Sequence, residues 1–131
     1  MAFSPDATMA LIAVGRLLLG CLFILGGIGH LFALPSIAGQ MGQRGVPLPM
    51  PTLIFGTAFQ IVAGASLMLG LFVPLAALGL ILFTLAGSVM MLNFWNMTGE
   101  KRMTAIDNWQ SNLGVIGGLL IVAALAFGKV A

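Results

Sequence analysis

The chain alternates between long apolar runs and short polar stretches. Four runs approach or exceed the roughly 20 apolar residues that a membrane-spanning helix needs, and they cover about 9–33, 52–72, 74–93 and 109–127. Inside lipid the backbone amides must pair with one another, and a helix achieves this within one segment. The pattern predicts an all-α membrane protein, a four-transmembrane-helix bundle with both termini on the same side.

The connections between these runs differ in length and polarity. Only a few residues separate the second and third runs, and Pro74 stands where proline is tolerated, in the first turn of a helix. These two spans are therefore expected to form an antiparallel hairpin. The stretch 34–51 is polar and proline-rich, with a short interfacial helix expected over 36–43. The stretch 96–108 is expected to be a polar loop.

Composition supports the membrane assignment. The 131 residues are 60% hydrophobic and 6% charged, whereas a typical soluble domain is about 25% charged. So few charges could not cover a water-facing surface of this size. No internal repeat or second domain is visible, so a single transmembrane domain over 1–131 is expected.

The sequence lacks the residues that several kinds of functional site require. Cys21 is the one cysteine, so the chain holds no intrachain disulfide and no Cys-x-x-Cys pair. His30 is the one histidine, so neither a bis-histidine haem nor a zinc site within one chain is supported. The net charge of +2 does not make a nucleic-acid-binding patch. We expect no intrinsic cofactor and no metal.

Arg16 is the most informative single residue. It lies about 10 Å along the first span, counted at 1.5 Å per residue, where an arginine costs roughly 2.5–3.5 kcal/mol. Either its side chain reaches back to the headgroups, or it faces the bundle interior. No Asp or Glu lies in any span. An interior Arg16 would need a backbone carbonyl, Gln60, water, a lipid phosphate, another subunit or a bound carbonyl compound as its partner.

Helical spacing places Arg16 on one face with Gly20, Phe23, Gly27 and His30. Small residues mark the side on which a membrane helix packs against its neighbours. The spacing therefore favours an interior position for Arg16 and His30. A lone histidine is more often a hydrogen-bonded structural residue than a metal ligand.

Gln60 is the strongly polar residue of the second span and lies between Gly56 and Gly64. One interpretation is an interhelical hydrogen bond, worth about 0.6–2 kcal/mol in membranes. The other interpretation is a ligand contact. Asn93, Trp95 and Asn112 lie at the ends of spans three and four, at the level of His30. They could line a headgroup-sized site or simply decorate the membrane–water interface.

The order of several motifs resembles the DoxX family of small bacterial membrane proteins, over nearly the whole chain. The first span matches with an arginine before an LLG stretch and a glycine pair before a histidine. A G-x-P turn and an aromatic motif after the third span match as well. The matching segments are 15–30, 45–47, 60–71, 74–77, 93–95 and Asn112. Two positions depart from the family pattern. Family members usually carry Glu where this chain has Gln60, and commonly His where it has Asn93.

The resemblance implies a multi-pass protein of the cell inner membrane with a tie to membrane redox chemistry. Relatives include the quinone-reactive subunit of a thiosulfate–quinone oxidoreductase. The leading hypothesis is an accessory subunit of a redox or respiratory-type membrane complex that contacts quinone or lipid and is not catalytic alone. Its expected partners are the bilayer and other membrane subunits or further copies of itself. The candidate ligand contacts are Arg16, His30, Gln60, Asn93, Trp95 and Asn112.

Two alternatives belong to other classes. The first is a structural or assembly subunit that docks through glycine-rich faces and binds no ligand. The second is a small-molecule or lipid transporter. Four spans make a narrow bundle, so transport would need an oligomer, and spans without carboxylates argue against proton coupling.

Overall fold

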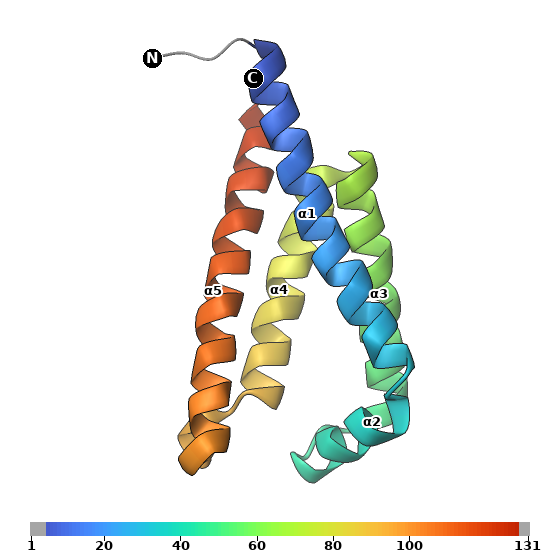
Figure 1. Ribbon diagram of the computed structural model, residues 1–131. Coiled ribbons are helices and arrows are strands. Elements are labelled where there is room, and N and C mark those ends of the chain that lie inside the picture. Colours follow the sequence, from blue (N-terminus) through green and yellow to red (C-terminus); the bar gives the residue numbers. More distant parts are fainter. Residues whose placement is uncertain (1–4, 129–131) are drawn as a thin grey trace.

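The computed structural model describes residues 5–128, and within that range it contains helices and no strands (Figure 1). The elements in order are α1 (Pro5–Leu31), α2 (Leu34–Gln43), α3 (Pro49–Leu69), α4 (Val73–Met91), the 3-10 turn η1 (Phe94–Asn96) and α5 (Gly99–Gly128). Four helices, α1, α3, α4 and α5, are long and apolar enough to cross a membrane. The predicted all-α membrane bundle is confirmed.

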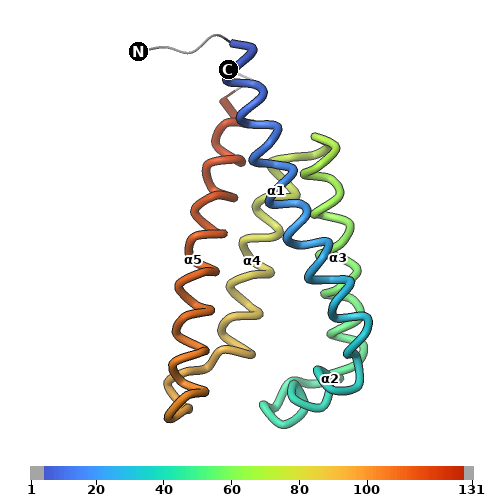
Figure 2. Tube along the Cα trace, in the orientation of Figure 1, coloured from blue at the N-terminus to red at the C-terminus, as the bar shows by residue number. Residues whose placement is uncertain are grey.

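The four long helices form two pairs. The most extensive contacts join α1 to α3 and α4 to α5, and the short α3–α4 connection links the pairs. In Figure 2, α1 begins and α5 ends at one end of the bundle, while α2 and the start of α5 lie at the other. This end is called the α2 end below. The arrangement confirms that the first and last spans start and finish on the same side.

Glycines allow α1 and α3 to approach closely. A Cβ atom on Gly64 would lie 2.9 Å from the carbonyl oxygen of Gly20, and a Cβ on Gly27 would collide with Ile61. Backbones that approach this closely gain van der Waals contact, which is a main source of helix association in lipid. Gly20, Phe23 and Gly27 are the buried residues of α1, so the face predicted from helical spacing is the packed face.

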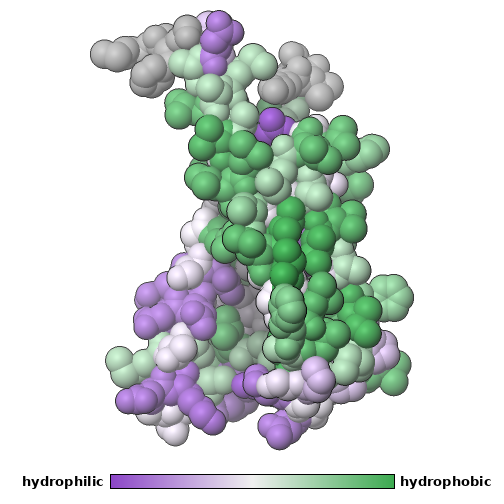
Figure 3. Space-filling model, turned by 45° about the vertical axis from the view of Figure 1, so that its right-hand side comes forward, coloured by the Kyte–Doolittle hydropathy of each residue, from purple (hydrophilic) through white to green (hydrophobic). Residues whose placement is uncertain are grey.

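The hydrophobic core lies mainly where α3, α4 and α5 meet. Its fully covered side chains are Leu67, Ala77, Leu80 and Leu119. Outside this core, large apolar side chains such as Leu18, Leu82 and Ile121 are exposed. Figure 3 shows hydrophobic side chains across the middle of the visible face, with hydrophilic side chains gathered mainly toward the α2 end. Such a surface is suited to lipid rather than water.

The hairpin between α3 and α4 forms as predicted. Gly70 ends α3 in the left-handed region at φ 75°, and the amides of Gly70 and Leu71 donate to the carbonyls of Leu67 and Ser66. This is a glycine-based helix stop. Phe72 also has a positive φ, and Pro74 lies in the first turn of α4.

The stretch expected as a polar loop over 96–108 is largely helical. The helix α5 begins at Gly99, ten residues before the expected start of the fourth span. Glu100, Lys101, Arg102 and Met103 are good helix formers, and Ala105 is 3% exposed. The prediction of a loop was therefore wrong. The polar residues of this stretch belong to a helix that continues beyond the apolar span. The short helix expected over 36–43 is present as α2.

Candidate ligand cavities between the helices

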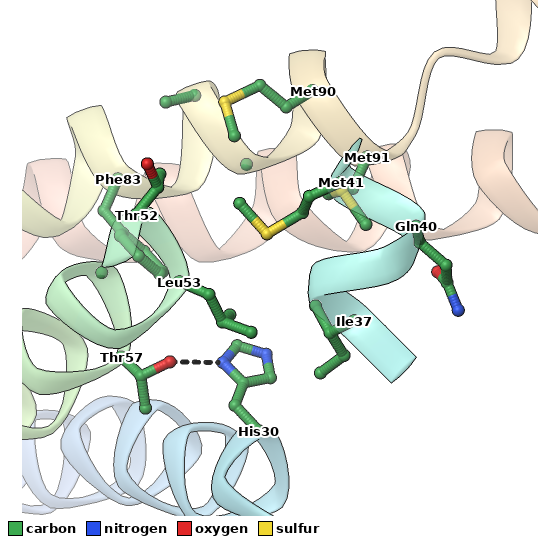
Figure 4. Close-up of a pocket in the computed structure, with 13 residues that line it drawn as sticks. His30, Ile37, Gln40, Met41, Thr52, Leu53, Thr57, Phe83, Met90 and Met91 are labelled. Atoms are coloured by element: carbon green, nitrogen blue, oxygen red, sulfur yellow. Dashed lines mark hydrogen bonds between the residues drawn. The ribbon is translucent and has the colours of Figure 1, made fainter. Parts of the chain in front are cut away.

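A cavity of about 410 Å³ opens between α1, α2, α3 and α4 at the α2 end; it is called the α2 cavity here. Its lining is mostly apolar and includes the buried Met41 of α2 (Figure 4). Polar side chains are few: His30, Gln40, Thr52 and Thr57. Small-molecule sites typically combine such apolar walls with a few placed polar groups.

His30 and Thr57 form the polar pair on the wall of this cavity. His30 lies in the last turn of α1, and its Nδ1 is 3.3 Å from the hydroxyl oxygen of Thr57 on α3 (Figure 4). Thr57 is 2% exposed, whereas the His30 side chain is only partly covered. The contact orients the ring through Nδ1, and no hydrogen bond of Nε2 is found within residues 5–128.

A second cavity, of about 380 Å³, reaches α5 and is called the α5 cavity here. It is lined by side chains of α1, α3, α4 and α5, among them Gln60, Thr84 and Asn112. The two cavities share part of their walls, through His30, Phe83, Gly87 and Met91. They are therefore adjacent compartments at the junction of the two helix pairs.

Gln60 joins α3 to α1 beside the α5 cavity. Its Nε2 donates to the carbonyl oxygen of Phe23 at 2.8 Å, and the side chain is 5% exposed. This contact fixes the amide orientation, because the oxygen of an amide cannot face a carbonyl oxygen favourably. The Oε1 atom is buried and has no hydrogen-bond partner within residues 5–128. The interhelical bond foreseen for Gln60 thus uses only one of its two ends.

The helix α4 contributes two hydroxyl side chains, Thr84 and Ser88, to this cavity. Thr84 is 8% exposed, and its Oγ1 is buried without a partner in the described part of the chain. One turn on, Ser88 donates to the Thr84 carbonyl at 2.7 Å and accepts from Nδ2 of Asn112 at 2.8 Å. Ser88 is therefore satisfied, whereas Thr84 is not.

The sequence-predicted site residues divide into three places. His30, Gln60 and Asn112 line the α5 cavity together.

Asn93 instead accepts a 3.4 Å hydrogen bond from Nε of Arg44, beyond α2. Trp95 is 54% exposed and borders a separate groove with Asn93. The second aromatic residue at this end, Trp109, donates to the carbonyl of Leu92 at 2.7 Å.

Arg16 lies at the opposite end of α1. It precedes His30 by fourteen residues, or about 21 Å along a helix, so the two side chains cannot contact one headgroup. Arg16 lines a depression of about 280 Å³ with Gly70 and the start of α4. Its Nε is buried without a hydrogen-bond partner in residues 5–128. Gln60, one partner considered for Arg16, is bonded to Phe23 instead.

Sequence reasoning missed three of the polar cavity residues: Thr57, Thr84 and Ser88. A signal was present in their spacing. Thr57 precedes Gln60 by three residues, and Thr84 precedes Ser88 by four, so each pair shares a helix face. Hydroxyl residues are common in membrane helices, which is why these pairs did not stand out. No group of three or more His, Cys, Asp or Glu residues that could hold a metal ion occurs within 5–128.

Fold and cavities together define a small multi-pass membrane protein with two adjacent interhelical pockets, one at the α2 end and one that reaches the middle of the spans. The DoxX family model matches residues 11–93, and the chain belongs to the DoxX family. The chain is also similar to the inner membrane protein YphA of Escherichia coli K12, with 27% identity over 125 residues, covering 95% of this chain and 89% of that protein. These matches support an inner membrane location. No solved structure matches the chain.

Proposed function

We propose that this inner membrane protein is an accessory subunit of a membrane redox complex and that its paired cavities hold the headgroup of a quinone-class lipid. The observation that carries the proposal is the α2 cavity, about 410 Å³ in volume, with the His30–Thr57 pair on an otherwise apolar wall. The volume lies within the roughly 300–1,000 Å³ range of small-molecule sites.

The chemistry of the wall fits a headgroup that carries oxygen atoms on an apolar ring. Phe83, Met90 and Met91 provide flat and flexible apolar contacts. In the His30 tautomer that carries its proton on Nε2, Thr57 donates to Nδ1 and the Nε2–H can donate to a ring oxygen. The isoprenoid tail of such a lipid would remain among the exposed apolar side chains of the helices.

In this proposal the chain binds and orients the headgroup, and a partner protein exchanges electrons with it. The purified chain alone is therefore expected to show no turnover with soluble electron donors. Independent quinone reductase activity from this chain would contradict the accessory role.

The direct test is to purify the protein in lipid nanodiscs and quantify co-purifying quinone by solvent extraction and mass spectrometry. His30→Leu should lower the bound quinone several-fold. Cys21→Ala is the matched control, because Cys21 is exposed on the same helix and lines neither cavity. Unchanged quinone in His30→Leu, or none in the wild type, would refute the binding site.

The assembly-subunit alternative makes a different prediction for the same preparation. It expects stoichiometric protein partners and no bound quinone or lipid headgroup. A transporter would bind its solute and move it across a sealed vesicle without any partner. The extraction and a partner analysis together separate the three classes.

A further inference from the structure

The two unpaired polar groups beside the α5 cavity carry a further inference. Gln60 and Thr84 are each more than nine-tenths buried and both line this cavity. Their Oε1 and Oγ1 atoms have no partner within residues 5–128. Leaving such a group unpaired in the interior costs about 1–3 kcal/mol. Both residues line one cavity, and both atoms are covered by neighbouring side chains, so a ligand that displaces those side chains can supply the missing hydrogen bonds.

The polarity of the missing partner follows from the bond that Gln60 already makes. Its Nε2 donates to the Phe23 carbonyl, so the end left over is the amide oxygen, which can only accept. The hydroxyl of Thr84 can accept as well as donate. A ligand that satisfies Gln60 must therefore bring an O–H or N–H group.

The nearby polar groups do not change this requirement. Ser88 is occupied on both sides by Thr84 and Asn112. His30 holds Thr57 through Nδ1, at the wall that the two cavities share. The acidic residues within 5–128 are Asp6, Glu100 and Asp107, and none of them lines the α5 cavity. A cationic ligand would therefore lack a counter-charge, so a neutral hydroxyl is the favoured donor.

We infer that the α5 cavity is a subsite for a neutral hydroxyl donor, so that the paired cavities bind the dihydroxy form of a quinone-class headgroup more tightly than the dicarbonyl form. This inference rests on the proposed function. The carbonyl form would set one acceptor against another at Gln60, whereas the hydroxyl form donates to it. The expected preference is about tenfold, which corresponds to one well-placed buried hydrogen bond.

A preference for the reduced ligand has a redox consequence. Tighter binding of the reduced form raises the reduction potential of the bound couple, by about 30 mV for a tenfold preference in a two-electron couple. The bound headgroup would then accept electrons more readily than the same headgroup free in the bilayer.

The test compares decylubiquinol and decylubiquinone as probes with the protein in nanodiscs under anaerobic conditions. The dissociation constant of each is measured by competition and mass spectrometric quantification. Three variants are compared with wild type: Gln60→Leu, Thr84→Val and the conservative Thr84→Ser. Circular dichroism and thermal denaturation confirm that each variant is folded.

The expected result is a roughly tenfold preference for the quinol in wild type, reduced to about threefold or less in Gln60→Leu. Because the Thr84 hydroxyl can bond either form, Thr84→Val should weaken both probes and keep the preference, whereas Thr84→Ser should resemble wild type. Equal affinities in wild type would overturn the inference and leave the proposed function standing; this is the result expected if buried water alone satisfies both groups. A preference undiminished in Gln60→Leu would also overturn it. Failure of both probes to bind would overturn the inference and the proposed function together.

Discussion

The side-chain amide of Gln60 on α3 donates to the backbone carbonyl of Phe23 on α1 across 2.8 Å. A backbone carbonyl has two lone pairs, so Phe23 can accept this bond in addition to its helical one. The bond therefore joins the two helices without breaking either. It lies at the wall of a cavity, so one side chain serves both the packing of the bundle and the candidate site.

Replacing Gln60 with Leu should remove this bond at a small cost. The interior loses one interhelical hydrogen bond, worth about 0.6 kcal/mol on average in membranes, and also loses an unpaired buried oxygen. We expect the unfolding free energy, measured by denaturation in a mixed micelle, to change by less than about 1 kcal/mol. A loss of several kcal/mol would show that Gln60 is essential to the fold rather than to the site.

The close approach of α1 and α3 should be far more sensitive. A Cβ on Gly20 would collide with the carbonyl oxygen of Gly64 and with Met68. Gly20→Ala should destabilise the protein by about 1–3 kcal/mol, the usual cost of overpacking. Gly29→Ala is the matched control on the same helix, because its Cβ would meet nothing within 4 Å. Equal effects of the two substitutions on thermal denaturation would contradict the observed packing.

The contact between Arg16 and the α3–α4 turn can be tested by a double-mutant cycle. Gly70 has φ 75°, and its Cβ would collide with the guanidinium of Arg16. Gly70→Ala should therefore cost about 1–2 kcal/mol for backbone strain plus a smaller cost for displacing the flexible guanidinium of Arg16. In an Arg16→Ala background only the strain should remain. Strictly additive losses in unfolding free energy would contradict this coupling and show that the guanidinium moves aside at no cost.

The substitution Arg16→Leu distinguishes the two interpretations of Arg16. If its side chain only reaches the headgroups, Arg16→Leu should relieve an insertion cost of roughly 2.5–3.5 kcal/mol and leave a folded protein. If Arg16 is bound in the interior, Arg16→Leu should reduce assembly with partner subunits. Membrane insertion yield and the amount of co-purifying partner subunits, measured on the same samples, distinguish these results.

Arg44 ties the end of α2 to the end of α4. It donates to Asn93 at 3.4 Å and to the carbonyl of Gln40 at 3.3 Å. Because α2 covers the α2 cavity with Met41, loosening this tie should expose the cavity. Arg44→Gln should increase hydrogen exchange in α2 several-fold. Arg102→Gln, which removes a cation that stacks on Phe94, is the control and should leave α2 exchange unchanged.

The sequence was sufficient for the architecture because lipid imposes simple requirements. Long apolar runs must be helices, and small residues mark their packed faces, so Gly20 and Gly27 were placed correctly. The start of α5 was not predicted, because charged residues indicate that a segment lies outside the membrane core and do not indicate whether it is helix or loop. Helix propensity at Glu100, Lys101 and Arg102 was the better guide.

The cavities were harder to foresee than the helices. They exist because α1–α3 and α4–α5 pack as two pairs that leave space between them, and this depends on helix crossing geometry that hydropathy does not encode. His30, Gln60 and Asn112 were selected as isolated polar residues in apolar surroundings, and the structure brings them to one cavity. Arg16 was selected in the same way but lies at the other end of the bundle. Helical spacing shows which residues share a face of one helix, and it does not show which residues of other helices they contact.

Native mass spectrometry of the protein, released from its membrane in a mild detergent, tests the central claim most directly. The account predicts the chain in complex with other subunits and carrying a quinone-class adduct, with the adduct lost in His30→Leu and kept in Cys21→Ala. A chain that carries no such adduct, with or without partner subunits, would contradict it.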